Sequence, residues 1–210
     1  MPWSAVLFLD CLSCALLGCA AAFRGGRHNL PFTGALILGM ACALISPVAR
    51  SIMIWIGVQI VPRVAAFDER AYVAASFAGA FAGWLLQRRI SEKTPLFPAL
   101  EGASLALATV LGTHVALALG LTTPLGGVLV GCMAGTVGGV LRDVCLSERP
   151  AVLEVDFYGS AVAVGAMAVT GLHVLYVDFW AQMGLGVFCV LALRLFGSRR
   201  ARRIGFVSEF

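Results

Sequence analysis

Apolar residues fall in long runs along this 210-residue chain, separated by short polar segments such as FRGGRHNLP, QRRISEKTP and SERP. A helix that crosses a lipid bilayer needs about 20 mostly apolar residues. The alternating pattern of a membrane β-barrel does not occur in the sequence. The pattern therefore predicts an all-α membrane protein with seven transmembrane helices. They cover roughly residues 4–22, 31–49, 71–88, 97–119, 124–145, 157–175 and 178–196.

Composition supports this prediction. The chain is 60% hydrophobic and only 12% charged, whereas ordinary globular domains are about 25% charged. The first apolar run contains Asp10 and has no basic residue before it, so it is interpreted as a retained span and not as a removable signal. The connections are too short to hold a separate soluble domain.

Basic residues are distributed unevenly between alternate connections. An N-terminus outside the cell gives outer segments with Arg63 and Arg70 only, and the positive-inside rule then predicts a cytoplasmic C-terminus. The basic tail could also contact anionic lipid headgroups. The ten inner basic residues are Arg24, Arg27, Arg88, Arg89, Lys93, Arg149, Arg199, Arg200, Arg202 and Arg203.

Signatures of enzymes and metal sites are missing from the sequence. All seven cysteines fall inside predicted spans, and Cys11-x-x-Cys14 lacks a second ligand pair, so small apolar packing is a simpler interpretation than a redox or metal pair. There is no phosphate loop and no nucleophile elbow. We therefore expect no enzymatic activity, no resident metal or cofactor, and no nucleic-acid partner; a bound lipid is compatible with the pattern.

Two segments of the chain resemble each other. Residues 34–50 align with residues 126–142 through Gly34, Gly39, Val48 and Arg50, and residues 72–82 align with residues 158–168 through a tyrosine, a glycine and three alanines. Residues 1–90 and 95–176 are thus interpreted as two copies of a three-helix unit, with residues 177–210 adding a seventh helix and a basic cytoplasmic tail. Because three is odd, the second copy is inverted, which is typical of transporters with a midplane site. Chance similarity between alanine-rich helices is the alternative.

Glycines in the predicted spans suggest close packing of helices. Gly127, Gly131 and Gly135 recur every four residues and so lie on one helix face, while Gly79 and Gly165 provide small residues in the third and sixth spans. Small residues let two helices approach closely in lipid. These five glycines are therefore predicted to serve helix packing.

Gly138-Gly139 and Ser46-Pro47 occupy matched places in the two copies. Adjacent glycines and proline both kink or interrupt helices. We therefore expect broken second and fifth helices whose freed carbonyls line a pore or substrate path, where carbonyl oxygens can replace the hydration shell of a cation.

Arg142 and Arg50 follow these positions by three residues in each copy. Charges inside a membrane are costly and usually mark function, although both arginines could instead anchor helix ends at the headgroups. Asp143 can pair with Arg142, and its counterpart in the first copy is Ser51. Asp10 and Glu101 could simply mark the wet ends of their spans.

The segment GGVLRDVCLSERP resembles the Gly-Gly-x-x-Arg-Asp signature of the bacterial family related to trimeric intracellular cation (TRIC) channels, also described as glycine transporters. The resemblance spans nearly the whole chain and implies a bacterial inner (plasma) membrane location. It implies a homotrimer that conducts potassium, and sodium less well, through a pore in each subunit lined by the second and fifth helices, and it implicates Gly138, Gly139, Arg142 and Asp143. The first copy departs from the family pattern at Ser46-Pro47 and Arg50-Ser51. A carrier for a small zwitterion such as glycine remains the alternative function.

Overall fold

The computed structural model describes residues 3–58, 70–90, 96–120, 123–154 and 158–203. Arg63 and Lys93, which entered the count of basic residues, lie outside the described residues. The described part of the chain is helical and contains no strand. Its helices are α1 (Trp3–Arg27), α2 (Phe32–Val58), α4 (Arg70–Leu86), α5 (Leu96–Ala118), α6 (Pro124–Cys145), α7 (Ala151–Glu154), α8 (Tyr158–Val174) and α9 (Phe179–Arg203).

Five of these helices, α1, α2, α5, α6 and α9, are long and apolar enough to cross a membrane. Helices α4 and α8 have 17 residues each, at the lower limit of about 17–25 residues for a spanning helix. The all-helical membrane fold predicted from the sequence is confirmed. The exact number of spans is not fixed by helix length alone.

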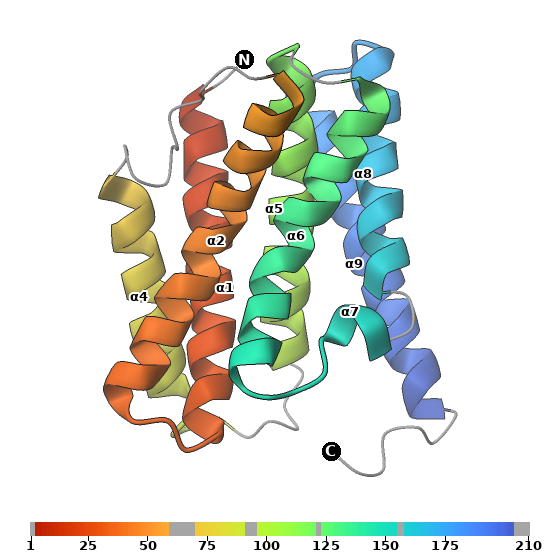
Figure 1. The fold of residues 1–210 in the computed structure, drawn as a ribbon. Coiled ribbons are helices and arrows are strands. Elements are labelled where there is room, and N and C mark those ends of the chain that lie inside the picture. Colours follow the sequence, from red (N-terminus) through yellow and green to blue (C-terminus); the bar gives the residue numbers. More distant parts are fainter. Residues whose placement is uncertain (1–2, 59–69, 91–95, 121–122, 155–157, 204–210) are drawn as a thin grey trace.

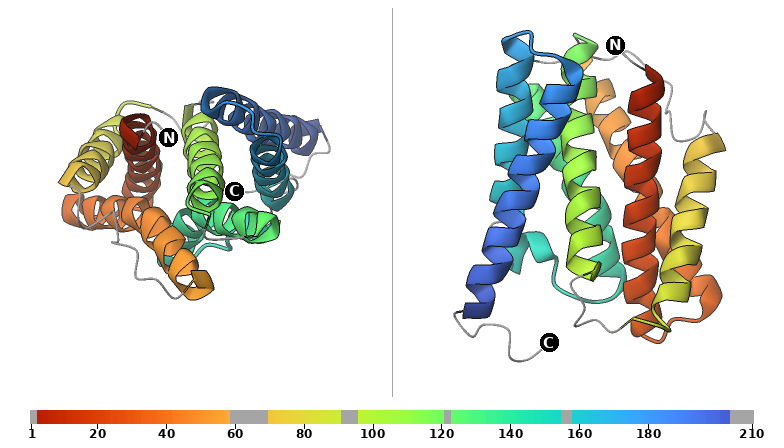
Figure 2. Two further views of the ribbon diagram at one scale, coloured as in Figure 1. Left: turned by 90° about the horizontal axis from the view of Figure 1, so that it is seen from above. Right: turned by 180° about the vertical axis from the view of Figure 1, so that it is seen from behind.

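The helices form a bundle in which α1, α2 and α4 pack together and α5, α6 and α8 pack together (Figure 1). Contacts of α2 with α6 and of α1 with α5 join the two groups, and α9 packs against α5 and α8. Helix α1 begins at one end of the bundle and α9 ends at the other (Figure 2). These ends are called the Trp3 end and the Arg27 end below, after the first and last residues of α1.

Glycines sit at the closest helix contacts inside the bundle. A Cβ atom on Gly79 would collide with the backbone carbonyl of Ala15 in α1, and one on Gly165 would collide with the Val190 side chain in α9. Gly127, Gly131 and Gly135 of α6 face side chains of α5 in the same way. Without a hydrophobic driving force in lipid, such close approach supplies much of the packing energy between helices.

The expectation of broken second and fifth helices is not confirmed. Helix α2 continues through Ser46-Pro47, with a bend that is visible from above (Figure 2), and α6 continues through Gly138-Gly139. Proline removes the hydrogen bond to the carbonyl four residues earlier, and its ring crowds that carbonyl. The Cys14 thiol donates to this carbonyl, on Ala43, at 3.4 Å. Residues of neighbouring helices pack against both Gly138 and Gly139 of α6.

Candidate functional site

A buried ionic cluster joins the three helices of the first half. Arg50 Nη2 of α2 lies 2.5 Å from Asp10 Oδ2 of α1, and the Tyr72 hydroxyl of α4 donates to the same carboxylate oxygen at 2.6 Å. All three side chains are buried. We call this group the Asp10 cluster; it lies toward the Trp3 end of the bundle.

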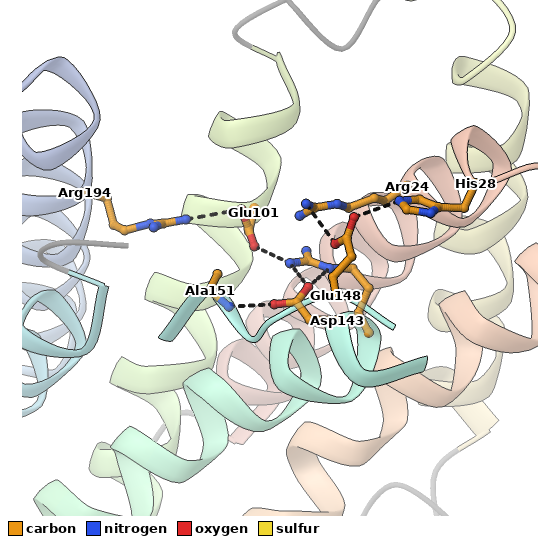
Figure 3. Close-up of polar contacts among 8 residues, drawn as sticks. Arg24, His28, Glu101, Asp143, Glu148, Ala151 and Arg194 are labelled. Carbon is orange, nitrogen blue, oxygen red and sulfur yellow. Dashed lines mark hydrogen bonds and ion pairs between the residues drawn. The ribbon is translucent and has the colours of Figure 1, made fainter. Parts of the chain in front are cut away.

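A second ionic cluster lies toward the Arg27 end. Arg142 Nη2 of α6 donates to Glu101 Oε1 of α5 at 2.8 Å, and Arg142 Nε and Nη2 donate to Asp143 Oδ1 at 2.8 and 2.6 Å. Arg194 of α9 binds the other oxygen of Glu101 at 3.2 Å, so that Glu101 lies between two arginines, and Asp143 Oδ2 accepts a hydrogen bond from the Ala151 backbone at 2.8 Å (Figure 3). These four side chains form the Glu101 cluster.

The two clusters use matched positions of the two copies. In each, the arginine of the second helix binds the acid of the first helix, as Arg50 binds Asp10 and Arg142 binds Glu101. The matched tyrosines also lie in or beside the clusters: Tyr72 binds Asp10, and the ring of Tyr158 lies 4.3 Å from the Arg194 guanidinium. The arginine–acid pair therefore recurs at opposite ends of the bundle, while the two matched tyrosines make different contacts.

Both arginines are enclosed by protein. Arg142 is 0% exposed and Arg50 is 5% exposed. A headgroup anchor extends its charged end into the interface, so this alternative does not describe either side chain. Taking paired charges out of water carries a large desolvation cost, and removing one partner leaves an uncompensated buried charge. Each cluster pairs equal numbers of carboxylates and guanidinium groups and is formally neutral.

Helices α2 and α6 meet between the two clusters. The Ser46 hydroxyl donates to the Ala134 carbonyl at 2.6 Å. At the matched position of α6, Gly138 packs against the Cys42 carbonyl, which would lie 2.7 Å from a Cβ atom placed on the glycine. At this crossing, Ser46 of α2 thus contacts a backbone carbonyl of α6, and Gly138 of α6 contacts a backbone carbonyl of α2. In addition, the Tyr158 hydroxyl would lie 2.9 Å from a Cβ atom on Gly139.

A cavity of about 210 Å³ opens beside the Asp10 cluster. Asp10, Arg50, Tyr72 and Ser51 supply its polar wall, and the remaining lining residues are apolar. The Ser51 hydroxyl also donates to the Pro47 carbonyl at 3.0 Å, which ties it to the bend in α2. Pro47 and Ser51 are therefore both linked to the wall of this cavity.

An ionic contact at the Arg27 end ties α1 to the segment that follows α6. Arg24 Nη2 and His28 Nε2 lie 2.9 and 2.7 Å from the two carboxylate oxygens of Glu148 (Figure 3). These side chains are partly exposed, so the contact is weaker than those in the clusters. Among the described residues, no three histidine, cysteine or acidic side chains form a metal site.

Sequence reasoning identified the two arginines but not their principal partners. Asp10 and Glu101 were interpreted only as helix-end markers, and Tyr72 and Tyr158 only as matched positions. Arg194 was not singled out at all. The available signal was that an acid and a tyrosine recur at the same places in both copies.

Several known proteins are similar to this chain in sequence. A family model described as "Glycine transporter" matches residues 99–174, which include the Glu101 cluster except Arg194. The chain is 29% identical over 199 residues to a UPF0126 membrane protein of Deinococcus radiodurans, covering 94% of this chain and 89% of the relative. It is 24% identical over 191 residues to the UPF0126 inner membrane protein YadS of Escherichia coli, covering 90% of each chain.

Solved structures of channels have the same fold. A prokaryotic TRIC channel matches with a TM-score of 0.81 at 19% identity, covering 94% of this chain and 98% of that chain. The TRIC orthologue of Rhodobacter sphaeroides matches with a TM-score of 0.84 at 23% identity, covering 92% and 97%. The resemblance to TRIC-like proteins seen in the sequence is confirmed, and the chain is a multi-pass membrane protein with the TRIC channel fold.

Proposed function

We propose that this protein is a monovalent cation channel that conducts potassium through a path within each subunit. The observation that carries the proposal is the cavity at the Trp3 end, whose polar wall is formed by Asp10, Arg50, Tyr72 and Ser51. The proposed path runs from this cavity past the crossing of α2 and α6 toward the Glu101 cluster. The residues of α2 and α6 that border it are Ser46, Pro47, Arg50, Ser51, Gly138, Gly139, Arg142 and Asp143.

The chemistry of the cavity suits weak and repeated binding of a cation. Asp10 already binds Arg50 and Tyr72, so it attracts a passing ion without holding it as a free carboxylate would. Hydroxyl oxygens from Tyr72 and Ser51 can replace part of the hydration shell of potassium. Conduction requires binding that is strong enough for entry and weak enough for release.

The neighbouring structures support the same conclusion. The prokaryotic proteins with this fold are described as cation channels, and the orthologue from Rhodobacter sphaeroides is described as trimeric. We extend both properties to this chain and propose a homotrimer surrounded by membrane lipid. Since each subunit contains its own pair of clusters, each subunit would hold its own path.

We also propose an orientation in the membrane. Arg24, Arg27, Arg88, Arg89 and Arg149 gather at the Arg27 end of the bundle. The positive-inside rule places that end in the cytoplasm and the cavity at the outer face. A cation entering from outside would then meet the Asp10 cluster first.

A carrier for glycine is the second candidate. It is favoured by the family model's description and by Arg142 Nη1, which is buried and has no hydrogen-bond partner in the described part of the chain. That group could donate to a substrate carboxylate. A carrier would need an occluded site and movement of one repeat against the other.

Flux through liposomes distinguishes the two functions. Purified protein is reconstituted with a potassium gradient and no glycine, and potassium flux is recorded for the wild type and for Arg142→Ala, with protein-free vesicles as the control. Rapid, unsaturable potassium flux altered by the substitution supports the channel. Saturable glycine uptake without potassium flux would instead establish the carrier.

A further inference from the structure

A second cavity, of about 320 Å³, lies at the Trp3 end among α5, α8 and α9. His114 and Gln182 contribute polar side chains to its wall, and His173, Tyr176 and Phe179 contribute rings. It lies on different helices from the Asp10 cluster and the crossing of α2 and α6. Its chemistry therefore needs a separate explanation.

Gln182 determines which nitrogen of His114 carries the proton. The Gln182 amide nitrogen donates to the Val177 carbonyl at 2.7 Å, so its carbonyl oxygen faces His114 Nδ1 at 2.8 Å. An amide oxygen only accepts hydrogen bonds, so Nδ1 must be the protonated nitrogen in the neutral ring. Nε2 is then an acceptor.

No group in the described part of the chain donates to His114 Nε2, although this nitrogen is buried and the residue is only 5% exposed. Buried acceptors nearly always have a donor, because leaving one unpaired costs free energy. A ligand that completes this site must therefore bring an N–H or O–H group.

The surrounding rings select the charge of that ligand. The His114 ring lies 5.0 Å from the Phe179 ring and 5.9 Å from the His173 ring, and Tyr176 stands at the cavity mouth with 96% of its surface exposed. Aromatic faces attract cations. Among the described residues that line the cavity there is no lysine or arginine to repel a cation.

Tyr176 is held at the mouth by an unusual backbone. Its φ angle is +54°, in the left-handed region that glycine or asparagine usually occupies at the end of a helix. Two hydrogen bonds that close the end of α8, from the backbone of Tyr176 to His173 and from Val177 to Leu172, maintain this conformation. The strained position fixes an aromatic side chain beside the cavity.

We propose that this cavity is a binding site for a primary ammonium group, which donates to His114 Nε2 and rests against the rings of Phe179 and Tyr176. The group could belong to the headgroup of phosphatidylethanolamine or to a soluble amine. The exposed apolar residues Val174 and Leu175 beside the mouth suit the boundary of the membrane.

The test compares primary ammonium groups with quaternary ones, which carry the same charge but have no N–H to donate. Delipidated protein in detergent is titrated with dihexanoylphosphatidylethanolamine, dihexanoylphosphatidylcholine, methylammonium and tetramethylammonium, and the thermal unfolding midpoint is recorded. A ligand that binds only the folded state raises this midpoint. We expect a rise of several degrees with at least one primary ammonium compound and none with its quaternary partner. A rise with only the lipid or only methylammonium identifies the source of the group.

Two substitutions and one control locate the site. His114→Phe keeps a ring but removes the acceptor and should abolish the rise, whereas His28→Phe at the opposite end should retain it. Tyr176→Ala changes an exposed side chain and leaves the core intact, so it tests the site even if His114→Phe does not fold; affinity should fall about fivefold. Equal rises with primary and quaternary compounds, no rise with any compound, or an unchanged rise in folded His114→Phe would overturn the proposal.

Discussion

Arg50 and Asp10 are 40 residues apart in the sequence, yet their side chains meet at 2.5 Å inside the bundle. The pair has a counterpart at the other end, where Arg142 meets Glu101. An inverted repeat places the two pairs on opposite sides of the crossing of α2 and α6. Each end of the proposed path thereby contains a paired arginine and acid, and at the Asp10 cluster the two charges can be removed separately.

Removing the two charges of the Asp10 cluster one at a time should change potassium flux in opposite directions. Arg50→Gln leaves the carboxylate at the cavity and should raise flux several-fold, and Asp10→Asn leaves the guanidinium and should lower it. The reason is that two unit charges 4 Å apart interact by about 4 kcal/mol at an effective dielectric constant near 20. Liposome flux per reconstituted protein measures both. A change in the same direction for both variants would show that the cluster acts on folding and not on the ion.

Two glutamates test how strongly burial affects an ion pair. Glu101→Gln leaves Arg142 and Arg194 without their shared carboxylate in a buried site and should lower the free energy of unfolding by about 3–5 kcal/mol. Glu148→Gln removes a similar charge from a partly exposed contact with Arg24 and His28 and should cost less than about 1 kcal/mol. Denaturant unfolding in detergent compares the two. Similar losses would mean that Glu101 is less enclosed than the structure indicates.

Packing of α1 against α4 should depend on Gly79 having no side chain. In Gly79→Ala the new Cβ would collide with the Ala15 carbonyl, which forces the helices apart; overpacking of this kind typically costs about 1–3 kcal/mol. Gly184→Ala is the matched control, because no atom lies within 4 Å of its new Cβ. The control should be neutral or stabilise the protein by up to about 1 kcal/mol through helix propensity. Thermal unfolding of the two variants in detergent measures the difference, and equal midpoints would contradict the close packing.

Hydropathy alone was sufficient to predict the membrane class and the helical fold. Run length determines whether a helix can cross lipid, and the apolar runs of this chain are uninterrupted enough to be counted. The matched positions of Arg50 and Arg142 were also visible, because intramembrane arginines are rare. These features depend on local sequence, which is why they could be identified without the fold.

The partners of those arginines depend on packing between distant segments. Whether Asp10 faces Arg50 or the headgroups is decided by the rotation of α1 against α2, which hydropathy does not specify. The predicted helix breaks were not confirmed, for a related reason. Gly138 was interpreted through its cost to an isolated helix, but its small size allows the Cys42 carbonyl to approach.

Cys14 and Pro47 provide a test of that compensation. Because Pro47 has no N–H, the Ala43 carbonyl lacks its usual donor in the helix, and the Cys14 thiol reaches it at 3.4 Å. Cys14→Ala should therefore destabilise the protein more when Pro47 is present than in a Pro47→Ala background, where the new backbone N–H can serve the carbonyl. The expected coupling energy is about 0.5–1 kcal/mol, the size of a modest hydrogen bond, measured by a double-mutant cycle of unfolding free energies. Additive effects would mean that the thiol fills space beside α2 without supporting its continuity through the proline.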